Sequence, residues 1–361
     1  MDYLDYPASG LQRKINAILA KPHQPFFIMG IIVAIIGIAF TGAILNGHLD
    51  ANLKSYHVFT MAILMPTSLF LGFLFTVVYR FLLVNSFPKK EYMRVFWFLL
   101  FGTALSQVGF FVSDIIVVLS AILVLIAQIL SITHFVRAYK KSTVDDKRDV
   151  FWILVTFSSG ALATLLFAAS IFSDFVLQLA LYMAFYPFAV GVVFAVAQKM
   201  IPNFFSIYFS IMLPEKNHFL MPMVAVSLFG IAISNAFSIT TGIFVFNATG
   251  LIALLMLFYQ YKLIIRKAPP VLWILQIGAL WLLIGFVAGI AESITQSVPA
   301  LLQIHIWGVG FITTLIIGFG SRVAMGHSGR KIVADKKTTV IFISIIFLSI
   351  IRALGVFDAY L

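Results

Sequence analysis

One long apolar run constrains the fold of this chain more than any other feature. It extends from Val95 to Val136 and is broken only at Ser113-Asp114. A helix that crosses the hydrocarbon core of a bilayer needs ~20 mostly apolar residues at a rise of ~1.5 Å per residue. The run is about twice that length, so it must form two spans that turn back at Ser113-Asp114. We therefore expect an integral membrane protein.

The same length criterion divides the rest of the chain into further spans. Only 10% of the residues are charged, against roughly 25% in a soluble domain, so water cannot be the solvent for most of this surface. We expect an all-α fold, a polytopic transmembrane helix bundle of about eleven spans. It forms a single domain over residues 1–361, with a short cytoplasmic tail at residues 1–25. The expected spans are residues 26–46, 57–79, 93–112, 115–137, 150–171, 175–198, 219–237, 240–262, 270–291, 299–321 and 338–356.

The basic residues separate into two sets when these spans are counted in order. Of the 24 Lys and Arg residues, 22 fall on one face of the membrane, and only Lys54 and Arg352 fall on the other. Cytoplasmic loops are enriched in Lys and Arg, which predicts a cytoplasmic N-terminus and an outside C-terminus. The 22 residues are Arg13, Lys14, Lys21, Arg80, Lys89, Lys90, Arg94, Arg137, Lys140, Lys141, Lys147, Arg148, Lys199, Lys216, Lys262, Arg266, Lys267, Arg322, Arg330, Lys331, Lys336 and Lys337.

Composition and missing motifs exclude several classes of function. The net charge of +11 is spread over short clusters between spans, so we expect contact with the lipid bilayer and none with nucleic acid. The chain has no cysteine, which leaves His and Met as the soft or borderline metal ligands. No Asp, Glu or Lys lies centrally in an expected span, which argues against a proton-coupled carrier. The polar residues within spans are expected to form interhelical hydrogen bonds, and they include Gln107, Gln128, Tyr186, Asn235, Asn247 and Gln276.

The histidines are then the most informative side chains. His57 and His305 come from different spans but fall in the same, outer leaflet. Two facing imidazoles are what haem ligation or a copper site needs, although ordinary interfacial histidines are the alternative. Met61 and Met65 follow His57 at i+4 spacing, which suits either a thioether ligand or packing. The other histidines are expected in a loop or as headgroup and backbone partners: His48, His23, His134 and His218.

The tenth expected span is rich in glycine. Gly308 and Gly310 follow His305 closely and permit close approach of a neighbouring helix or a flat ligand. Trp307, near the outer end, is expected to anchor the span at the interface.

Around this span the chain resembles the NnrS family, haem- and copper-containing membrane proteins implicated in bacterial tolerance of nitric oxide. The stretch Ile304–Gly310, followed by Ser321–Arg330, is similar to the family's glycine-containing helix and its T-R-x-x-x-G-H-T-G-R run. Three shorter matches fall in the same order along the chain. They are Pro25–Phe27 to R-P-F-F, Tyr56–Met61 to W-H-x-H-E-M, and Lys199–Pro202 to R-[VM]-I-P.

The resemblance implies a set of site residues and also shows departures. The residues that match the family's motifs are His57, His305, Arg322, His327, Gly329 and Arg330. Phe59 and Thr60 stand where the family motif has a second His and a Glu, which weakens copper binding more than haem binding. The family typically has twelve spans, against eleven expected here.

These inferences lead to an expected function with rivals. The resemblance implies a haem protein, with copper as a further cofactor, in the cytoplasmic membrane of a bacterium, acting in the nitric oxide or nitrosative-stress response. His57 and His305 would be its metal ligands and Met61 a neighbour of the cofactor. A cofactor-free permease and a degenerate, scaffold-like member without metal are the alternatives. Whether the protein turns over a substrate is left open.

Overall fold

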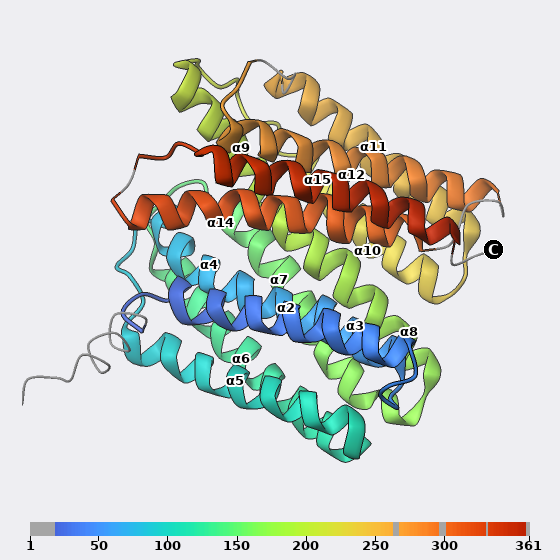
Figure 1. The fold of residues 1–361 in the computed structure, drawn as a ribbon. Helices are drawn as coiled ribbons and strands as arrows, with labels where there is room; N and C mark the ends of the chain where they lie inside the picture. The colour runs from blue at the N-terminus through green and yellow to red at the C-terminus, as the bar shows by residue number, and fades with distance from the viewer. Residues whose placement is uncertain (1–18, 263–266, 296–300, 330, 359–361) are drawn as a thin grey trace, which may run out of the picture. The chain divides into compact units, whose positions relative to one another are not determined.

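The computed structural model describes residues 19–262, 267–295, 301–329 and 331–358, which are helical or loop with no strand among them (Figure 1). Their contacts group into two compact units. Unit 1 comprises residues 1–150 and 160–181, and unit 2 comprises residues 151–159 and 182–361. Each unit is described by itself, so the expected single domain stays a prediction. Four of the basic residues lie outside the described ranges: Arg13, Lys14, Arg266 and Arg330.

The helices of unit 1 follow the expected spans closely. The elements are α2 (His23–Leu45), α3 (Leu53–Val58), η1 (Phe59–Leu64), α4 (Met65–Phe81), α5 (Lys89–Val112), α6 (Asp114–Lys141), α7 (Arg148–Ala169), η2 (Ser170–Phe172) and α8 (Asp174–Met183). α3, η1 and α4 form one continuous rod. Part of α7 and the last two residues of α8 belong to unit 2.

Unit 2 follows the expected spans, except that α9 continues to Phe209, eleven residues beyond the expected end at 198, and α14 to His327, six residues beyond 321. Its elements are η3 (Ala184–Val190), α9 (Gly191–Phe209), α10 (Leu220–Ala236), α11 (Thr240–Tyr261), α12 (Pro270–Ile294), α13 (Leu302–His305), η4 (Ile306–Thr313), α14 (Thr314–His327) and α15 (Lys336–Asp358). α8, η3 and α9 form one rod, and so do α13, η4 and α14.

The number of spans agrees with the sequence. Ten helices in the described part of the chain are long and apolar enough to cross a membrane. α10 is a shorter apolar helix of 17 residues. At ~1.5 Å per residue its length is about 26 Å, close to the thickness of the hydrocarbon core. The predicted polytopic helix bundle is therefore confirmed, whereas its orientation in the membrane stays a prediction.

The predicted turn at Ser113-Asp114 is confirmed. Ser113 has an extended backbone, with φ −167° and ψ 137°, and ends α5 abruptly. Its side chain accepts a hydrogen bond from the backbone N–H of Ile115 and so caps the start of α6. Gly109 lets the two helices approach, since a Cβ there would meet the backbone nitrogen of Val117 at 3.0 Å.

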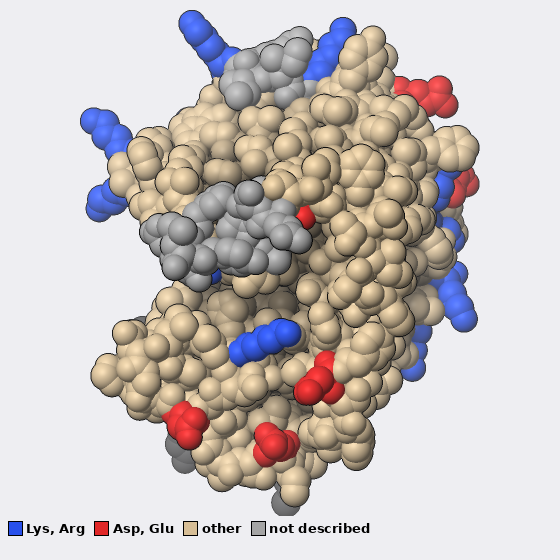
Figure 2. All heavy atoms as spheres, turned by 90° about the vertical axis from the view of Figure 1, so that its right-hand side faces the viewer, with Lys and Arg blue, Asp and Glu red and all other residues tan. Residues whose placement is uncertain are grey.

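Contacts within each unit place alternate loops at the same end. In unit 1, Ser142 donates to the carbonyl of Leu82, which brings together the ends of α6 and α4. In unit 2, Gln260 donates to the carbonyl of Glu215, which joins α11 to the loop before α10. These loops carry the basic clusters. Figure 2 looks onto the ends where α2 finishes and α3 begins, and red carboxylate side chains face the viewer there.

Three π-helical segments interrupt the long rods, and local sequence explains each. A π turn bonds each N–H to the carbonyl five residues back. Pro66, the second residue after η1, and Pro187, within η3, lack the N–H that an α-helix would need. In η4 the hydroxyl of Thr313 donates to the carbonyl of Gly308, five residues earlier, at 2.8 Å. The sequence reading did not anticipate these segments.

Candidate functional site

His57 is the second-to-last residue of α3, two residues before η1 begins, and is held against α2. Its Nδ1 lies 3.2 Å from the hydroxyl oxygen of Thr41 on α2. Asn52 starts α3 by accepting a hydrogen bond from the backbone N–H of Ser55 at 2.9 Å. The imidazole is half-buried. The contact with Thr41 fixes the orientation of the imidazole ring.

Tyr56 fixes the turn that carries His57. Its side chain is fully buried, and its hydroxyl donates to Oε1 of Gln107 on α5 at 2.8 Å. Its ring packs edge-on against Phe110, with ring centroids 5.3 Å apart. Gln107 thus makes an interhelical hydrogen bond, as predicted, and Gln128 does the same by donating to Thr67 at 3.0 Å.

Phe59 and Thr60 occupy the first turn of η1 and are both fully buried. The ring of Phe59 stacks on Phe167 with centroids 4.4 Å apart and an interplanar angle of 24°. Phe110 packs on the same ring at 5.8 Å. Where the family motif has a second histidine, this chain therefore has a closely packed aromatic core.

Met61 also lies in η1. A Cβ at Gly37 of α2 would meet its methyl carbon at 2.6 Å, so the thioether side chain lies against α2. The expected alignment of His57, Met61 and Met65 on one helix face assumed a regular α-helix. The π-helical segment η1 has more residues per turn, so these three side chains do not share one face as they would in an α-helix. Packing is the observed role of Met61, and its place beside a cofactor stays a prediction.

His305 is the last residue of α13, directly before η4. Its Nδ1 lies 2.8 Å from the carbonyl oxygen of Leu301, which can only accept a hydrogen bond. Nη2 of Arg352 on α15 lies 2.6 Å from its Nε2. A guanidinium can only donate, so Nε2 accepts and Nδ1 carries the proton. The ring is therefore held neutral, with its Nε2 lone pair aimed at a cation.

A polar network lies one turn before His305. The side chain of Gln303 donates to Oδ1 of Asn247 on α11 at 2.5 Å and accepts from the hydroxyl of Tyr186 in η3 at 3.3 Å. Its backbone N–H donates to Glu292 of α12 at 2.7 Å. The network ties four helical rods of unit 2 together around the turn that carries His305. Sequence reasoning missed Gln303 and Glu292 because their partners are distant in the chain.

The expectation that Trp307 anchors its span at the membrane interface is wrong. The sequence placed it at the membrane interface, but its side chain is 0% exposed. Its indole N–H donates to the carbonyl of Leu282 on α12 at 2.9 Å, and Phe286 packs edge-on against it at 4.9 Å. Gly285 provides the room, since a Cβ there would lie 1.9 Å from the indole nitrogen. Trp307 is thus a core residue that seats η4 against α12.

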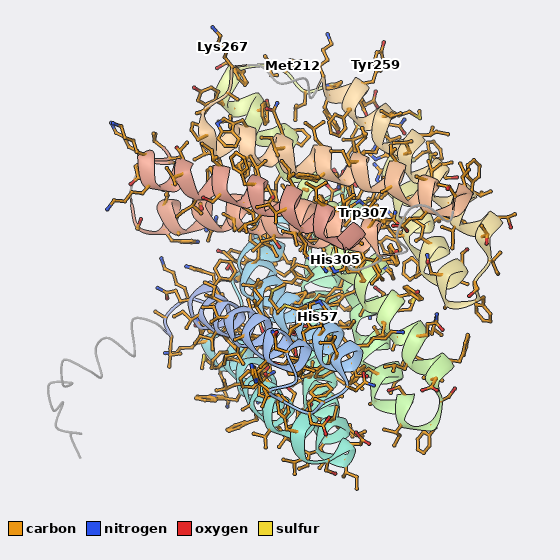
Figure 3. All side chains as sticks on the ribbon, turned by 45° about the vertical axis from the view of Figure 1, so that its right-hand side comes forward. His57, Met212, Tyr259, Lys267, His305 and Trp307 are labelled. Carbon is orange, nitrogen blue, oxygen red and sulfur yellow. The ribbon has the colours of Figure 1, made fainter. Side chains whose placement is uncertain are left out.

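The two candidate ligands share the same local setting. Each lies at the end of a short α-helical turn that runs into a π-helical segment, and each has Nδ1 beside a protein oxygen. His57 belongs to unit 1 and His305 to unit 2, and both are labelled in Figure 3. Their meeting at one cofactor stays a prediction. The described residues contain no group of three or more His, Cys, Asp or Glu side chains that would hold a metal ion.

Two further motif residues, Arg322 and Gly329, lie near the C-terminal end of α14, at the other end of the rod from His305. Arg322 lies over the ring of Phe204 on α9, with its guanidinium carbon 3.9 Å from the ring centroid. Gly329 adopts φ +70°, a left-handed conformation that suits glycine and ends the helix at His327. Arg330 lies outside the described residues. The contact between Arg322 and Phe204 thus brings together α14 and α9, the helices that carry two of the segments similar to the family's motifs.

The remaining histidines differ in part from expectation. His48 is exposed in the turn after α2, as predicted. His134, expected to face headgroups or backbone, instead lies with its Nδ1 3.2 Å from a carboxylate oxygen of Glu91. The acidic partner lies on the neighbouring helix α5, so hydropathy alone could not reveal the pair.

Two comparisons with known proteins bear on these residues. The model of the NnrS family, described as "NnrS protein", matches residues 17–361, which is nearly the whole chain. A search of curated proteins finds no match.

Proposed function

This chain belongs to the NnrS family, and on that premise we propose that it is a haem-binding protein of the bacterial cytoplasmic membrane that acts in the response to nitric oxide. His57 and His305 are its axial ligands in this proposal, each through Nε2. Copper, with Met61 beside His57, is the second candidate cofactor.

The observation that carries the proposal is the protein oxygen beside Nδ1 of each candidate ligand. Histidines that ligate a metal usually donate their other ring N–H to a carbonyl, a carboxylate or water, which fixes the tautomer and the ring orientation. His305 has this arrangement with the carbonyl of Leu301, while Nδ1 of His57 lies beside the hydroxyl of Thr41, which can donate or accept. These contacts fix the orientation of both rings, and in this proposal Nε2 of His305 binds the metal once Arg352 releases it. The π-helical segment that follows each histidine supports the same reading, because such segments are frequent at functional sites.

The residues around both histidines also provide an apolar environment that suits a bound haem. Fully buried aromatic side chains flank both histidines, with Tyr56 and Phe59 beside His57 and Trp307 two residues after His305. Such a shell excludes water and lowers the local dielectric, two of the means by which a protein tunes haem. Bound haem would supply an iron that takes up a diatomic gas or an electron. The residues' part is to ligate, orient and keep the site dry.

A visible spectrum with metal analysis tests the proposal. The full-length protein is produced in haem-replete cells and purified in mild detergent. We expect a Soret band and iron, both lost in His57→Ala and in His305→Ala. His48→Ala is the matched control, because His48 is exposed in a turn on the same predicted face, and it should keep the band. Nitric oxide added to the reduced protein should shift the spectrum.

Other outcomes would redirect the assignment. A colourless, iron-free protein from haem-replete cells would overturn the haem proposal and favour the permease or the scaffold. Copper without haem would transfer the proposal to His57 and Met61. A Soret band that survives both histidine substitutions would retain the cofactor but reject these ligands.

A further inference from the structure

The site in question is Arg322, at the basic end of α14 in unit 2. Its guanidinium stacks on Phe204 of α9 at 3.9 Å, and Phe319, one turn earlier on α14, packs on the same ring at 6.3 Å. These two rings form an aromatic platform beneath the guanidinium. Phe319 is itself buried, so the platform has a rigid base.

The guanidinium of Arg322 has no acceptor in the described part of the chain. None of its five N–H groups forms a hydrogen bond or an ion pair with the residues described, and its Nε is fully buried. A half-buried charge with unused donors is costly unless a partner supplies acceptors. The side chain of Arg322 is therefore partly removed from water, and no described residue compensates its positive charge.

The surroundings favour an anionic partner from outside the chain. This end of unit 2 carries the exposed cations Lys262, Lys331, Lys336 and Lys337. Anions are attracted to such an end, and a planar guanidinium recognises phosphate oxygens in a bidentate manner.

We propose that Arg322, held over Phe204 at the cationic end of unit 2, binds a phosphate group. The phosphate belongs either to an anionic lipid headgroup or to a soluble phosphate. This site does not depend on the haem proposal, since it lies at the other end of α14 from His305. It gives a role to Arg322, which the proposed function leaves unused.

A binding experiment on the full-length protein in detergent tests this proposal. Dioctanoylphosphatidylglycerol and inorganic phosphate are titrated separately, and Kd is measured by calorimetry. We expect saturable binding that Arg322→Gln and Arg322→Lys weaken by at least about tenfold, since lysine keeps the charge but not the planar fork. Phe204→Leu removes the platform and should weaken binding by roughly threefold.

Lys267→Gln is the matched control. It removes one positive charge from an exposed side chain of the same unit, labelled in Figure 3, and should change Kd by less than about twofold. Binding of the lipid alone identifies a headgroup site, and equal binding of inorganic phosphate identifies a soluble ligand. The absence of saturable binding, or an equal loss in Lys267→Gln and Arg322→Gln, overturns the proposal. Arg322→Lys, with its unfolding temperature measured in parallel, separates lost binding from lost folding.

Discussion

Arg352 donates a hydrogen bond from its Nη2 to Nε2 of His305 over 2.6 Å, across α15 and α13. Arginine is costly in a transmembrane helix and rarely lacks a partner there. Here the partner is the same lone pair that would bind a metal. Coordination through Nε2 therefore requires Arg352 to release His305.

This competition predicts that Arg352→Leu binds haem more tightly than the unchanged protein. A hydrogen bond to a charged group contributes ~1.5–3 kcal/mol, so removing it should lower the Kd for haem by about tenfold. Haem titration of the apoprotein, followed at the Soret band, measures this change. Weaker binding in Arg352→Leu would show instead that the arginine assists the cofactor.

A second prediction concerns Gly285, which lies under the indole of Trp307. A Cβ at this position would lie 1.9 Å from the indole nitrogen, and the fully buried ring has no room to withdraw. Gly285→Ala should therefore lower the free energy of unfolding by about 3 kcal/mol or more. Thermal or denaturant unfolding in detergent measures the loss.

Gly320 supplies the control for this substitution. A Cβ there meets nothing within 4 Å, so Gly320→Ala adds a methyl group without a clash. It should be neutral or raise stability by up to ~1 kcal/mol through helix propensity. Equal losses for Gly285→Ala and Gly320→Ala would contradict the packing of Trp307 on α12.

The hydrogen bond between Tyr56 and Gln107 gives a third prediction. Tyr56→Phe removes the donor but keeps the ring against Phe110. Hydrogen bonds between membrane helices average ~0.6 kcal/mol and reach ~1.7 kcal/mol, which sets the expected coupling energy. A double-mutant cycle of Tyr56→Phe with Gln107→Leu measures it. A coupling energy near zero would show that this bond does not hold α3 to α5.

The stack of Phe59 on Phe167 gives a fourth prediction. Phe59→Ala should lower the free energy of unfolding by ~3–5 kcal/mol, because it leaves a cavity in a fully packed core. Phe101→Ala is the control, since that ring is 61% exposed on the helix surface. Similar unfolding temperatures for the two variants would refute the structural role of Phe59.

The span pattern could be read from the sequence because it depends on local properties. Apolar length and the end of the run at Ser113 predicted most helix ends within a few residues, although α9 continues to Phe209, beyond the expected end at residue 198. The predicted interhelical bonds are present at Gln107, Gln128 and Asn247, whereas Asn235 donates to the carbonyl of Ile231 on its own helix. The short helix α10 also fell within its expected range.

The candidate site was harder to predict from the sequence than the spans, because its contacts join distant parts of the chain. Arg352 and His305 are 47 residues apart, and nothing in either segment indicates the pair. Trp307 was misplaced because its position near a span end suggested an interface, whereas Gly285 on another helix makes room for it. The π turns were missed although Pro66 and Pro187 signal them, because a proline in a span predicts only that a backbone bond is lost. How the lost bond is replaced depends on the surrounding helices.

The single extended residue between α5 and α6 has a mechanical consequence. Ser113 leaves these two helices joined too tightly for either to be withdrawn from the bilayer alone. Under a pulling force the pair should leave in one event, whereas helices joined by longer loops can leave singly. During biosynthesis the same constraint makes the pair enter as a closed hairpin, with the basic residues at its two open ends, Lys89 and Lys140 among them, retained on one side.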